Sequence, residues 1–329
     1  MTGQPLLAVH DLSVHFATAE GTVHAVKGVD FTVEAGRTLG IVGESGSGKS
    51  VTSLAVMGLH RGATVTGSAK LHGRELIGAP EEEIRRLRGR TMAMVFQDAL
   101  TALHPYFTIG DQIAEAYREH HGGSRKRARA RAVDVLGDVG IPEPARRADE
   151  YPHQFSGGMR QRAMIALALS CEPDLIIADE PTTALDVTVQ AQVLELLMKL
   201  QQDRGLGIVM ITHDLGVIAR VADEVLVMYG GSAAEQAPAD TLFAAPRHPY
   251  TRGLLDSLPR LDAADGAALR SIPGTPPSLL TPPAGCAFHP RCPVYAAAGD
   301  PRCTGDRPAL RQVADGHRSA CVLDEVTTA

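Results

Sequence analysis

The sequence lacks three features that mark common classes of protein. It has no basic excess: 32 Lys and Arg stand against 38 Asp and Glu, a formal net charge of −6, which argues against a nucleic-acid-binding protein. It has no apolar run approaching the roughly 18 residues of a membrane-spanning helix. Residues 1–5 lack the basic start and apolar stretch of a signal peptide, so we expect the protein to stay in the cytoplasm.

The segment 43–50, Gly-Glu-Ser-Gly-Ser-Gly-Lys-Ser, follows an apolar run that predicts a buried strand and precedes a predicted helix. Its three glycines allow successive backbone N–H groups to point at a phosphate chain, and the helix start adds its positive dipole end. Lys49 is expected to reach the β- and γ-phosphates, and the Ser50 hydroxyl to bind Mg²⁺. A functionless glycine-rich turn would not explain why every motif position is filled. The residues expected at the nucleotide are Gly43, Ser45, Gly46, Ser47, Gly48, Lys49, Ser50 and Val51.

An adenine ring requires a flat aromatic partner ahead of this loop. Residues 7–16 and 23–33 alternate apolar and polar side chains, as half-buried strands do. Phe16 is the first candidate for stacking on adenine, and His24 is the second. A phenylalanine that packs within the sheet is nearly as good an explanation of Phe16.

Four polar residues directly follow predicted buried strands. Gln97 can place its amide oxygen on the metal or on the attacking water, although a loop or capping glutamine would look the same. Carboxylates at a buried strand tip are costly unless they serve a cation, so Asp179 is expected to hold Mg²⁺ and Glu180 to orient and deprotonate water. His213 can contact a γ-phosphate, whereas a lone histidine is usually structural.

Between about residues 108 and 171 the apolar periodicity becomes helical. Within this stretch Ser156-Gly157-Gly158-Met159-Arg160-Gln161 precedes an apolar helix. Ser156 is expected to cap that helix, and the glycines leave its start open to an anion. The chain thus carries a second site that can face phosphate. The basic run 125–131 predicts a solvated helix face, with contact to acidic lipid or to a partner as the alternative.

Cysteine is scarce, and four of the five cysteines (Cys286, Cys292, Cys303 and Cys321) lie near the C-terminal end. Nine of the chain's 21 prolines fall in residues 273–308, so this region needs a staple in place of a core. Disulfides are disfavoured in a reducing cytoplasm. Four thiolates fit a [4Fe–4S] cluster, but zinc competes because His289 lies midway between Cys286 and Cys292 with zinc-ligand spacing, and a segment without metal is the third possibility. Cys171 is predicted to be a small buried hydrophobe.

Taken in order, these motifs resemble those of the ATP-binding-cassette ATPases over roughly residues 5–240. In that family two cassettes meet head to tail, and each ATP lies between the phosphate loop of one chain and the signature of the other, here Ser156 to Gln161. By this resemblance, Ser50, Gln97 and Asp179 form the Mg²⁺ site. It also implies that Gln97 senses the γ-phosphate, that Glu180 is the general base, that Asp186 acts across the interface and that His213 holds the γ-phosphate.

The resemblance implies an α/β fold of the P-loop NTPase class. It comprises a RecA-like core, an antiparallel β subdomain, a helical subdomain at about 98–172 and a small, irregular, metal-stapled C-terminal extension. Residues 1–240 would form the ATP-binding cassette, and residues 241–329 the extension with its four-cysteine cluster.

A narrower resemblance is to the ATPases of oligopeptide, dipeptide and nickel importers, and to the first, D-type, of their two ATPase subunits. It is carried by residues 151–155, 179–190 and 248–251. Some dipeptide importer ATPases carry a [4Fe–4S] cluster in a similar C-terminal segment. Two residues depart from the family: Ala99 replaces a proline and His104 an asparagine. Both lie in the segment that faces the transmembrane partner, so they concern coupling and substrate and not ATP chemistry.

We therefore expect an ATP-hydrolysing motor subunit of a di- or oligopeptide importer, with a nickel importer as the alternative. Its partners would be a second, distinct ATPase subunit, two transmembrane permease subunits and an extracytoplasmic substrate-binding protein. It would lie peripherally on the cytoplasmic face of the membrane. A soluble ATPase acting on nucleic acid or ribosomes is a further hypothesis, but such proteins usually carry insertions or paired cassettes that this chain lacks. A regulatory metal or redox role of the C-terminus is compatible with the first hypothesis.

Overall fold

The computed structural model describes residues 4–183, 185–258 and 271–323. The chain divides into two compact units. The first unit is built mainly from Gly78–Ile211, together with Val33–Arg37. The second unit contains Leu7–Thr32, Thr38–Ile77 and the chain from Thr212 onward. The phosphate-binding loop and the C-terminal extension therefore belong to the same unit.

Three parallel strands form the centre of the first unit. They are β6 (Met92–Val95), β7 (Leu175–Asp179) and β8 (Gly207–Thr212), with Met92 opposite Leu175 and Ile177 opposite Val209. Nearly every residue in them is buried, as expected for parallel strands that are covered on both faces. The parallel register brings the carboxyl ends of β6 and β7 to one edge of the sheet.

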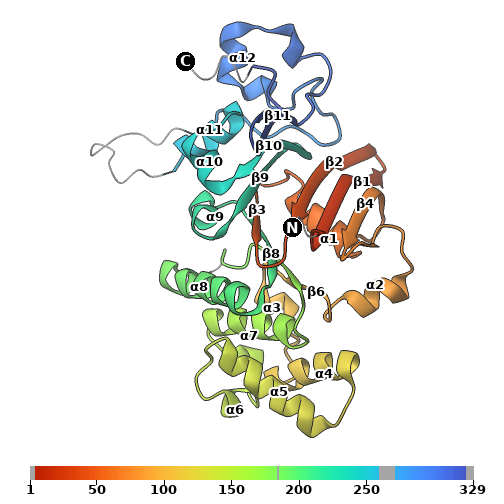
Figure 1. Cartoon of the computed structure of the whole chain (residues 1–329), viewed down its shortest axis with the longest axis vertical. Coiled ribbons are helices and arrows are strands. Elements are labelled where there is room, and N and C mark those ends of the chain that lie inside the picture. The colour runs from red at the N-terminus through yellow and green to blue at the C-terminus, as the bar shows by residue number, and fades with distance from the viewer. Residues whose placement is uncertain (1–3, 184, 259–270, 324–329) are drawn as a thin grey trace. The chain divides into compact units, whose positions relative to one another are not determined.

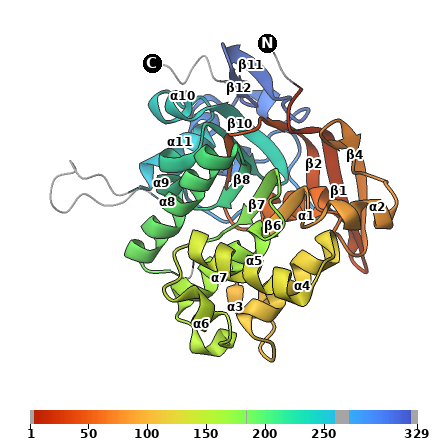
Figure 2. The same ribbon diagram turned by 60° about the horizontal axis from the view of Figure 1, so that its bottom comes forward.

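The chain between β6 and β7 is helical, as predicted for this stretch. The helices are α3 (Ala99–Ala102), α4 (Ile109–His121), α5 (Arg125–Asp138), α6 (Pro144–Arg147) and α7 (Gly157–Leu169), with a short 3₁₀ turn, η1 (Pro152–Gln154). Helices α4, α5 and α7 pack against one another (Figures 1 and 2). The unit also holds α2 (Glu81–Leu87) and α8 (Val187–Arg204). No helix in the described part of the chain is long and apolar enough to cross a membrane.

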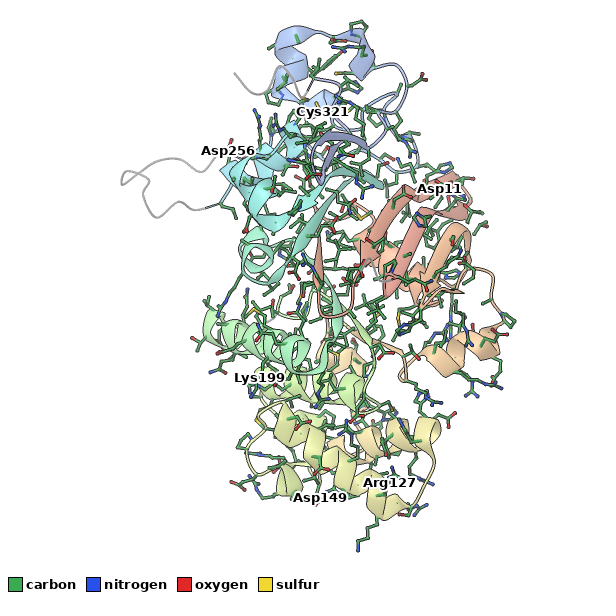
Figure 3. All side chains as sticks on the ribbon, viewed as in Figure 1. Asp11, Arg127, Asp149, Lys199, Asp256 and Cys321 are labelled. Atoms are coloured by element: carbon green, nitrogen blue, oxygen red, sulfur yellow. The ribbon has the colours of Figure 1, made fainter. Side chains whose placement is uncertain are left out.

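Two predictions about side chains of this unit can be compared with the structure. Cys171 is buried in a cluster with Tyr117 and Ala128, which confirms it as a small hydrophobe. The basic run is only partly solvated. Arg127, which is labelled in Figure 3, is exposed. The half-buried Arg131, in contrast, donates from Nε to the Ser170 carbonyl at 2.9 Å. Part of the run therefore secures helix packing.

The second unit begins with an antiparallel sheet in the order β2-β1-β4-β5. Its strands are β1 (Leu7–Thr18), β2 (Gly21–Val33), β4 (Ala63–Leu71) and β5 (Arg74–Glu75). The alternating burial of β1 follows the predicted pattern, with Leu7, Val9, Leu12 and Val14 fully buried. The expected antiparallel β element is thereby confirmed.

Five strands of a second sheet lie in this unit, in the order β11-β12-β10-β9-β3. Its strands are β3 (Thr38–Val42), β9 (Glu224–Tyr229), β10 (Ser232–Pro238), β11 (Arg311–Ala314) and β12 (His317–Ser319). Strands β3 and β9 are parallel and the other pairs are antiparallel. The helical elements are α1 (Lys49–Val56), α9 (Leu215–Val221), α10 (Ala239–Ala244), α11 (Pro249–Asp256), η2 (His289–Arg291), α12 (Pro293–Ala298) and η3 (Pro301–Cys303). The extension thus adds its two strands to the sheet that contains β3.

A buried carboxylate fastens the extension to this sheet. Glu235 on β10 is fully buried and lies 2.6 Å from His317 Nε2 on β12. It also accepts the backbone N–H groups of Arg247 and His248 at 2.7 and 2.9 Å. Burial alone would raise the pKa of Glu235, but the hydrogen bonds from His317 and these two backbone groups outweigh burial and lower it below the ordinary 4.5.

Replacing Glu235 with Gln should lower the free energy of unfolding at pH 7 by about 2 kcal/mol, since charge-assisted hydrogen bonds are lost. Because the folded-state pKa is lowered, the contribution of the carboxylate is fully present above pH 4.5 and is lost as the pH falls through the folded pKa. Urea titrations at several pH values should show the difference from wild type shrinking in acid. A matched Glu20→Gln variant, at an exposed turn, should change neither the free energy of unfolding nor its dependence on pH. A loss of stability in E235Q that does not vary with pH would contradict the prediction.

Candidate nucleotide-binding site

The loop between β3 and α1 is closed from within by a buried lysine. Lys49 is 6% exposed, and its ammonium group donates to the carbonyls of Gly43 at 2.7 Å and Glu44 at 3.0 Å. The Ser47 hydroxyl is buried and has no hydrogen-bond partner in the described structure. Ser45, Gly46 and Ser50 lie at the exposed rim. A ring of this kind, with a cation inside and a helix start at its end, suits a polyphosphate.

Two glycines make this ring possible. Gly43 has φ +153°, and a Cβ there would lie 2.8 Å from Ser47 Oγ and would collide with the Met228 carbonyl of β9. Gly48 has φ +100°, and a Cβ there would meet the Ala25 carbonyl of β2 at 2.5 Å. At both positions the backbone conformation favours glycine, and a carbonyl group of a neighbouring strand approaches too closely for a side chain. The loop is therefore wedged between two strands of its own unit.

Tyr250 is a loop contact that sequence reasoning missed. Its hydroxyl accepts the backbone N–H of Glu44 at 2.8 Å. His248, two residues earlier, is buried, and burial lowers its pKa to about 4. Its ring is therefore neutral, and Nδ1 accepts the Tyr250 backbone N–H at 3.1 Å. The only sequence signal was that both residues fall in the segment 248–251, which the family resemblance singled out.

In the first unit the structure brings Gln97 and Glu180 together. The Gln97 amide donates to Glu180 Oε2 at 3.0 Å, and Thr183 Oγ1 donates to the same oxygen at 2.9 Å. Glu180 has φ +47° and its N–H is held by the Ile211 carbonyl at 2.8 Å. Asp179, the last residue of β7, is 7% exposed. The amide and the two carboxylates at this edge have the oxygen chemistry that Mg²⁺ prefers.

The signature segment forms the start of α7. Ser156 is the predicted cap: its hydroxyl accepts the Met159 N–H at 3.3 Å. Ser156 and Gly157 are exposed, and Gly158 has room for no side chain because Val189 of α8 packs against it. Gln161 is 4% exposed, and its amide nitrogen has no partner in the described structure.

Four other predicted site residues lie on strands of the second unit or at strand and helix ends. Phe16 is half-buried on β1 opposite Ala63 of β4, and His24 is exposed on β2. His213 is the exposed residue that follows β8. Asp186 caps α8 by accepting the Val189 N–H at 3.0 Å, while Ala184 lies outside the described residues.

All four C-terminal cysteines line one small cavity. His289, Phe288, Tyr295 and Leu323 are among the other residues that line it. Cys292, Cys303 and Cys321 are buried, Cys286 is half-buried and none forms a disulfide; Cys321 is labelled in Figure 3. Burial, reinforced by the nearness of Cys292 and Cys303, raises the pKa of Cys286 to about 11.

Backbone N–H groups are directed at sulfur atoms of this cavity. Tyr295 donates to Cys292 Sγ at 3.4 Å and Leu323 donates to Cys321 Sγ at 3.3 Å. Such donors stabilise sulfur that carries negative charge. In the described part of the chain, however, no three His, Cys, Asp or Glu side chains form a group that could hold a metal ion. The predicted metal staple is therefore not established by the side-chain positions.

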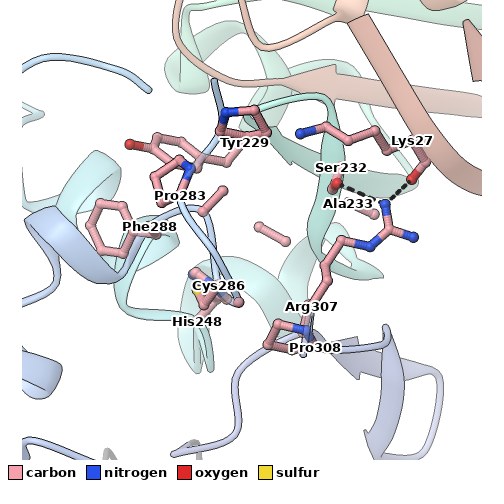
Figure 4. A pocket seen from close by; sticks show the side chains of 15 residues that line it. Lys27, Tyr229, Ser232, Ala233, His248, Pro283, Cys286, Phe288, Arg307 and Pro308 are labelled. Atoms are coloured by element: carbon pink, nitrogen blue, oxygen red, sulfur yellow. Dashed lines mark hydrogen bonds between the residues drawn. The ribbon is translucent and has the colours of Figure 1, made fainter. Parts of the chain in front are cut away.

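A larger pocket marks where the extension meets the strands of the second unit (Figure 4). Tyr229, Pro283 and Phe288 line its apolar side. On the other side, Arg307 donates from Nη1 to the Lys27 carbonyl at 2.8 Å and to Ser232 Oγ at 3.4 Å. The extension is thus anchored on β2 and β10 as well as through β12.

The chain matches known transporter proteins along most of its length. Residues 26–183 match the family model described as "ABC transporter", and residues 234–298 match "Oligopeptide/dipeptide transporter, C-terminal region". The chain is 50% identical over 318 residues to the dipeptide transport ATP-binding protein DppD of Escherichia coli (strain K12), covering 96% of both chains. It is 53% identical over 317 residues to the oligopeptide transport ATP-binding protein OppD of Salmonella typhimurium, covering 96% of this chain and 93% of the relative.

Solved structures support the same fold. The dimeric structure of MJ0796, a bacterial ABC transporter cassette, is similar with a TM-score of 0.65 and 28% identity, covering 71% of this chain and 98% of that one. A structure of cbiO1 from Clostridium perfringens, part of an ABC transporter complex, has a TM-score of 0.63 and 25% identity, covering 74% of this chain and 92% of that one. The P-loop NTPase cassette fold expected from the sequence is confirmed.

Replacing Gly43 with Ala should weaken the binding of ATP about tenfold or more, because the residue occupies a backbone region almost closed to side chains and its Cβ would displace the Met228 carbonyl. Titration with a fluorescent ATP analogue measures the change. Gly62→Ala is the matched control: it also has a positive φ, +73°, but nothing lies within 4 Å of the added carbon. Equal affinities of wild type and G43A would refute this account of the loop.

Proposed function

The chain belongs to the family of ABC transporter ATP-binding proteins of oligopeptide and dipeptide transport, and we propose that it is the ATP-hydrolysing motor subunit of a peptide importer. Residues 1–240 serve as the cassette and residues 241–329 as the extension. The observation that carries the proposal is that similarity to two such proteins spans 96% of the chain, while the loop around Lys49 has the form that a triphosphate requires.

At the nucleotide, Lys49 and the loop N–H groups hold the phosphates, and the Ser50 hydroxyl with Asp179 and Gln97 supplies oxygen ligands for Mg²⁺. The metal, when bound with ATP, neutralises phosphate charge. Glu180 accepts a proton from water as the water oxygen bonds to the γ-phosphorus and ADP leaves with the electrons of the broken P–O bond. His213 holds the γ-phosphate. The bond between Gln97 and Glu180 supports this assignment, since it joins a residue expected to sense the γ-phosphate to the proposed base.

Hydrolysis by this family requires two cassettes, and we assign Ser156, Gly157, Gly158, Gln161 and Asp186 to the nucleotide of a partner cassette. The exposed N-terminal end of α7 supports the assignment. Within their own unit these residues contact helix backbone and Val189. The related MJ0796 cassette was solved as a dimer. In this chain the partner is a second, distinct ATPase subunit.

An exposed aromatic group supports a docking site for the transmembrane permeases, on the cytoplasmic face of the membrane. Tyr106 is 82% and Phe107 52% exposed. His104, which replaces the family's asparagine, packs its ring 4.8 Å from that of Phe107 and 5.9 Å from that of Tyr106. Exposed apolar groups of this kind mark protein interaction sites. Import would further require two permeases and an extracytoplasmic substrate-binding protein.

The cysteine cavity suits an iron–sulfur cluster better than zinc. Zinc needs its ligands at about 2.0–2.3 Å from one point, and no such group exists among the described residues. A [4Fe–4S] cluster is larger than one ion, so its four thiolates stand apart around it. The donor chemistry agrees, with four thiols that form no disulfide around one cavity and N–H groups directed at sulfur. The cluster would supply the staple that this proline-rich segment lacks.

Replacing Glu180 with Gln should lower the rate of ATP hydrolysis about 10²- to 10⁴-fold, the usual contribution of a general base, while ATP binding persists. The variant should accumulate as an ATP-loaded dimer with the partner subunit, which size-exclusion chromatography with retained nucleotide detects. Glu195→Gln, on the exposed side of α8, is the control and should hydrolyse ATP normally. Turnover of E180Q at the wild-type rate would remove Glu180 from the role of base.

Protein purified without oxygen should contain about four iron and four sulfide per chain and show the broad visible absorption of a cluster. Cys292→Ser should reduce the iron content, whereas Cys171→Ser should not, because Cys171 lies in the other unit among apolar side chains. About one zinc and no sulfide would favour the zinc alternative. Neither metal in freshly prepared protein would contradict a metallated extension.

A further inference from the structure

Arg291 joins the extension to the phosphate-binding loop across 247 residues of sequence. Its Nη1 donates to Glu44 Oε2 at 2.7 Å and its Nη2 to Glu44 Oε1 at 3.1 Å, a two-point pair. The side chain of Arg291 is 7% exposed and that of Glu44 is 25% exposed. Exposed ion pairs contribute little to stability or binding, but this pair is largely withdrawn from water and its two-point geometry is specific.

The guanidinium of Arg291 is held in place by groups other than Glu44. Its Nε donates to the Pro273 carbonyl at 2.8 Å, its Nη2 to the Ile272 carbonyl at 3.3 Å and its Nη1 to the Tyr229 hydroxyl at 3.1 Å. Because each of the three nitrogens donates to the extension or to Tyr229 of β9, the orientation of Arg291 does not depend on Glu44 alone. Arg291 therefore sets the position of the carboxylate and does not merely follow it.

Glu44 transmits this position to the loop itself. Its carbonyl accepts the Lys49 ammonium at 3.0 Å and the Ser47 N–H at 3.2 Å. Its own N–H donates to Tyr250 at 2.8 Å. An unpaired carboxylate in a loop that receives a polyanion would also repel the ligand. Arg291 neutralises that charge at the same time as it fixes the geometry.

The backbone of Arg291 adjoins a residue of the cysteine cavity. Arg291 ends η2 and is followed directly by Cys292, which caps α12 through its sulfur. Phe288, at the start of η2, packs its ring 5.2 Å from Tyr229 and 5.3 Å from Tyr250. A change in the position of Cys292 is therefore expected to move the arginine that holds the loop.

We propose that Arg291 is a positioning residue of the ATPase, which keeps the phosphate-binding loop in its ATP-receiving form and couples that loop to the cysteine cavity. This inference rests on the ATPase activity proposed above and adds a means of regulating the same site. Arg291 does not touch the reacting atoms. Its effect is on the affinity for ATP and not on the chemical step.

The first test measures ATP affinity and steady-state kinetics on the full-length chain with its partner subunit. Arg291→Gln should raise the Kd and KM for ATP about tenfold, since the partly buried carboxylate of Glu44 loses its partner, and leave kcat within about twofold. Arg291→Lys, which keeps the charge but loses the two-point geometry, should have Kd and KM values between those of the wild type and of Arg291→Gln. Arg302→Gln is the matched control, because Arg302 also precedes a cysteine and pairs with a carboxylate, here Asp300 of the extension itself.

A double variant separates positioning from general damage to the fold. Glu44→Gln combined with Arg291→Gln should bind ATP more tightly than Arg291→Gln alone, because removing both partners leaves no unpaired charge. General damage to the fold would instead make the double variant bind ATP more weakly than either single variant. Wild-type affinity of R291Q, or additive losses in the double variant, would overturn the role of Arg291.

The coupling to the cysteine cavity has its own readout. Cys292→Ser should weaken ATP binding in the wild-type background and have no further effect in the Arg291→Gln background. Equal effects of Cys292→Ser in both backgrounds, or no effect in either, would overturn the coupling. If the ATPase function itself were wrong, the unmodified protein would neither bind nor hydrolyse ATP, an outcome distinct from all of these.

Discussion

The constraint on which this structure depends is a lysine ammonium enclosed by its own loop. Lys49 is buried, and it is satisfied by two carbonyls of the turn that it closes. A buried cation without partners would be too costly to keep, so the carbonyls of Gly43 and Glu44 must point inward. Only glycine fits at Gly43 and Gly48, where backbone from β9 and β2 approaches closely. The surrounding strands thus determine the shape of the phosphate site.

The C-terminal extension supports that site from outside. It adds β12 to β10, places Glu235 against His317, anchors Arg307 on β2 and holds Glu44 through Arg291. A proline-rich segment with few regular elements therefore gains its order from the cassette strands as well as from any metal. In return it restrains the first residues of the loop. This mutual support explains why the extension and the loop fall in one compact unit.

In the first unit, the pairing of parallel strands positions the predicted catalytic residues. Parallel strands β6 and β7 bring Gln97 and Glu180 to one edge, where the amide holds the proposed base at 3.0 Å. In the signature at the start of α7, Ser156 caps the helix and Gly158 lies against Val189. One chain hence contains a proposed base in contact with Gln97 and a helix start that we assign to the nucleotide of a partner cassette.

The sequence alone determined the local features whose physics is short-range. Glycines, a lysine and a hydroxyl in eight consecutive residues require a phosphate loop, and alternating or continuous apolar runs predict the strands that flank it. Tertiary structure decided the pairings between distant residues. Nothing in the spacing of Glu44 and Arg291 reveals their contact, because it arises where β9, α11 and the extension pack together. The same holds for the basic run of α5, since only packing against α7 turned Arg131 from a solvated cation into a helix contact.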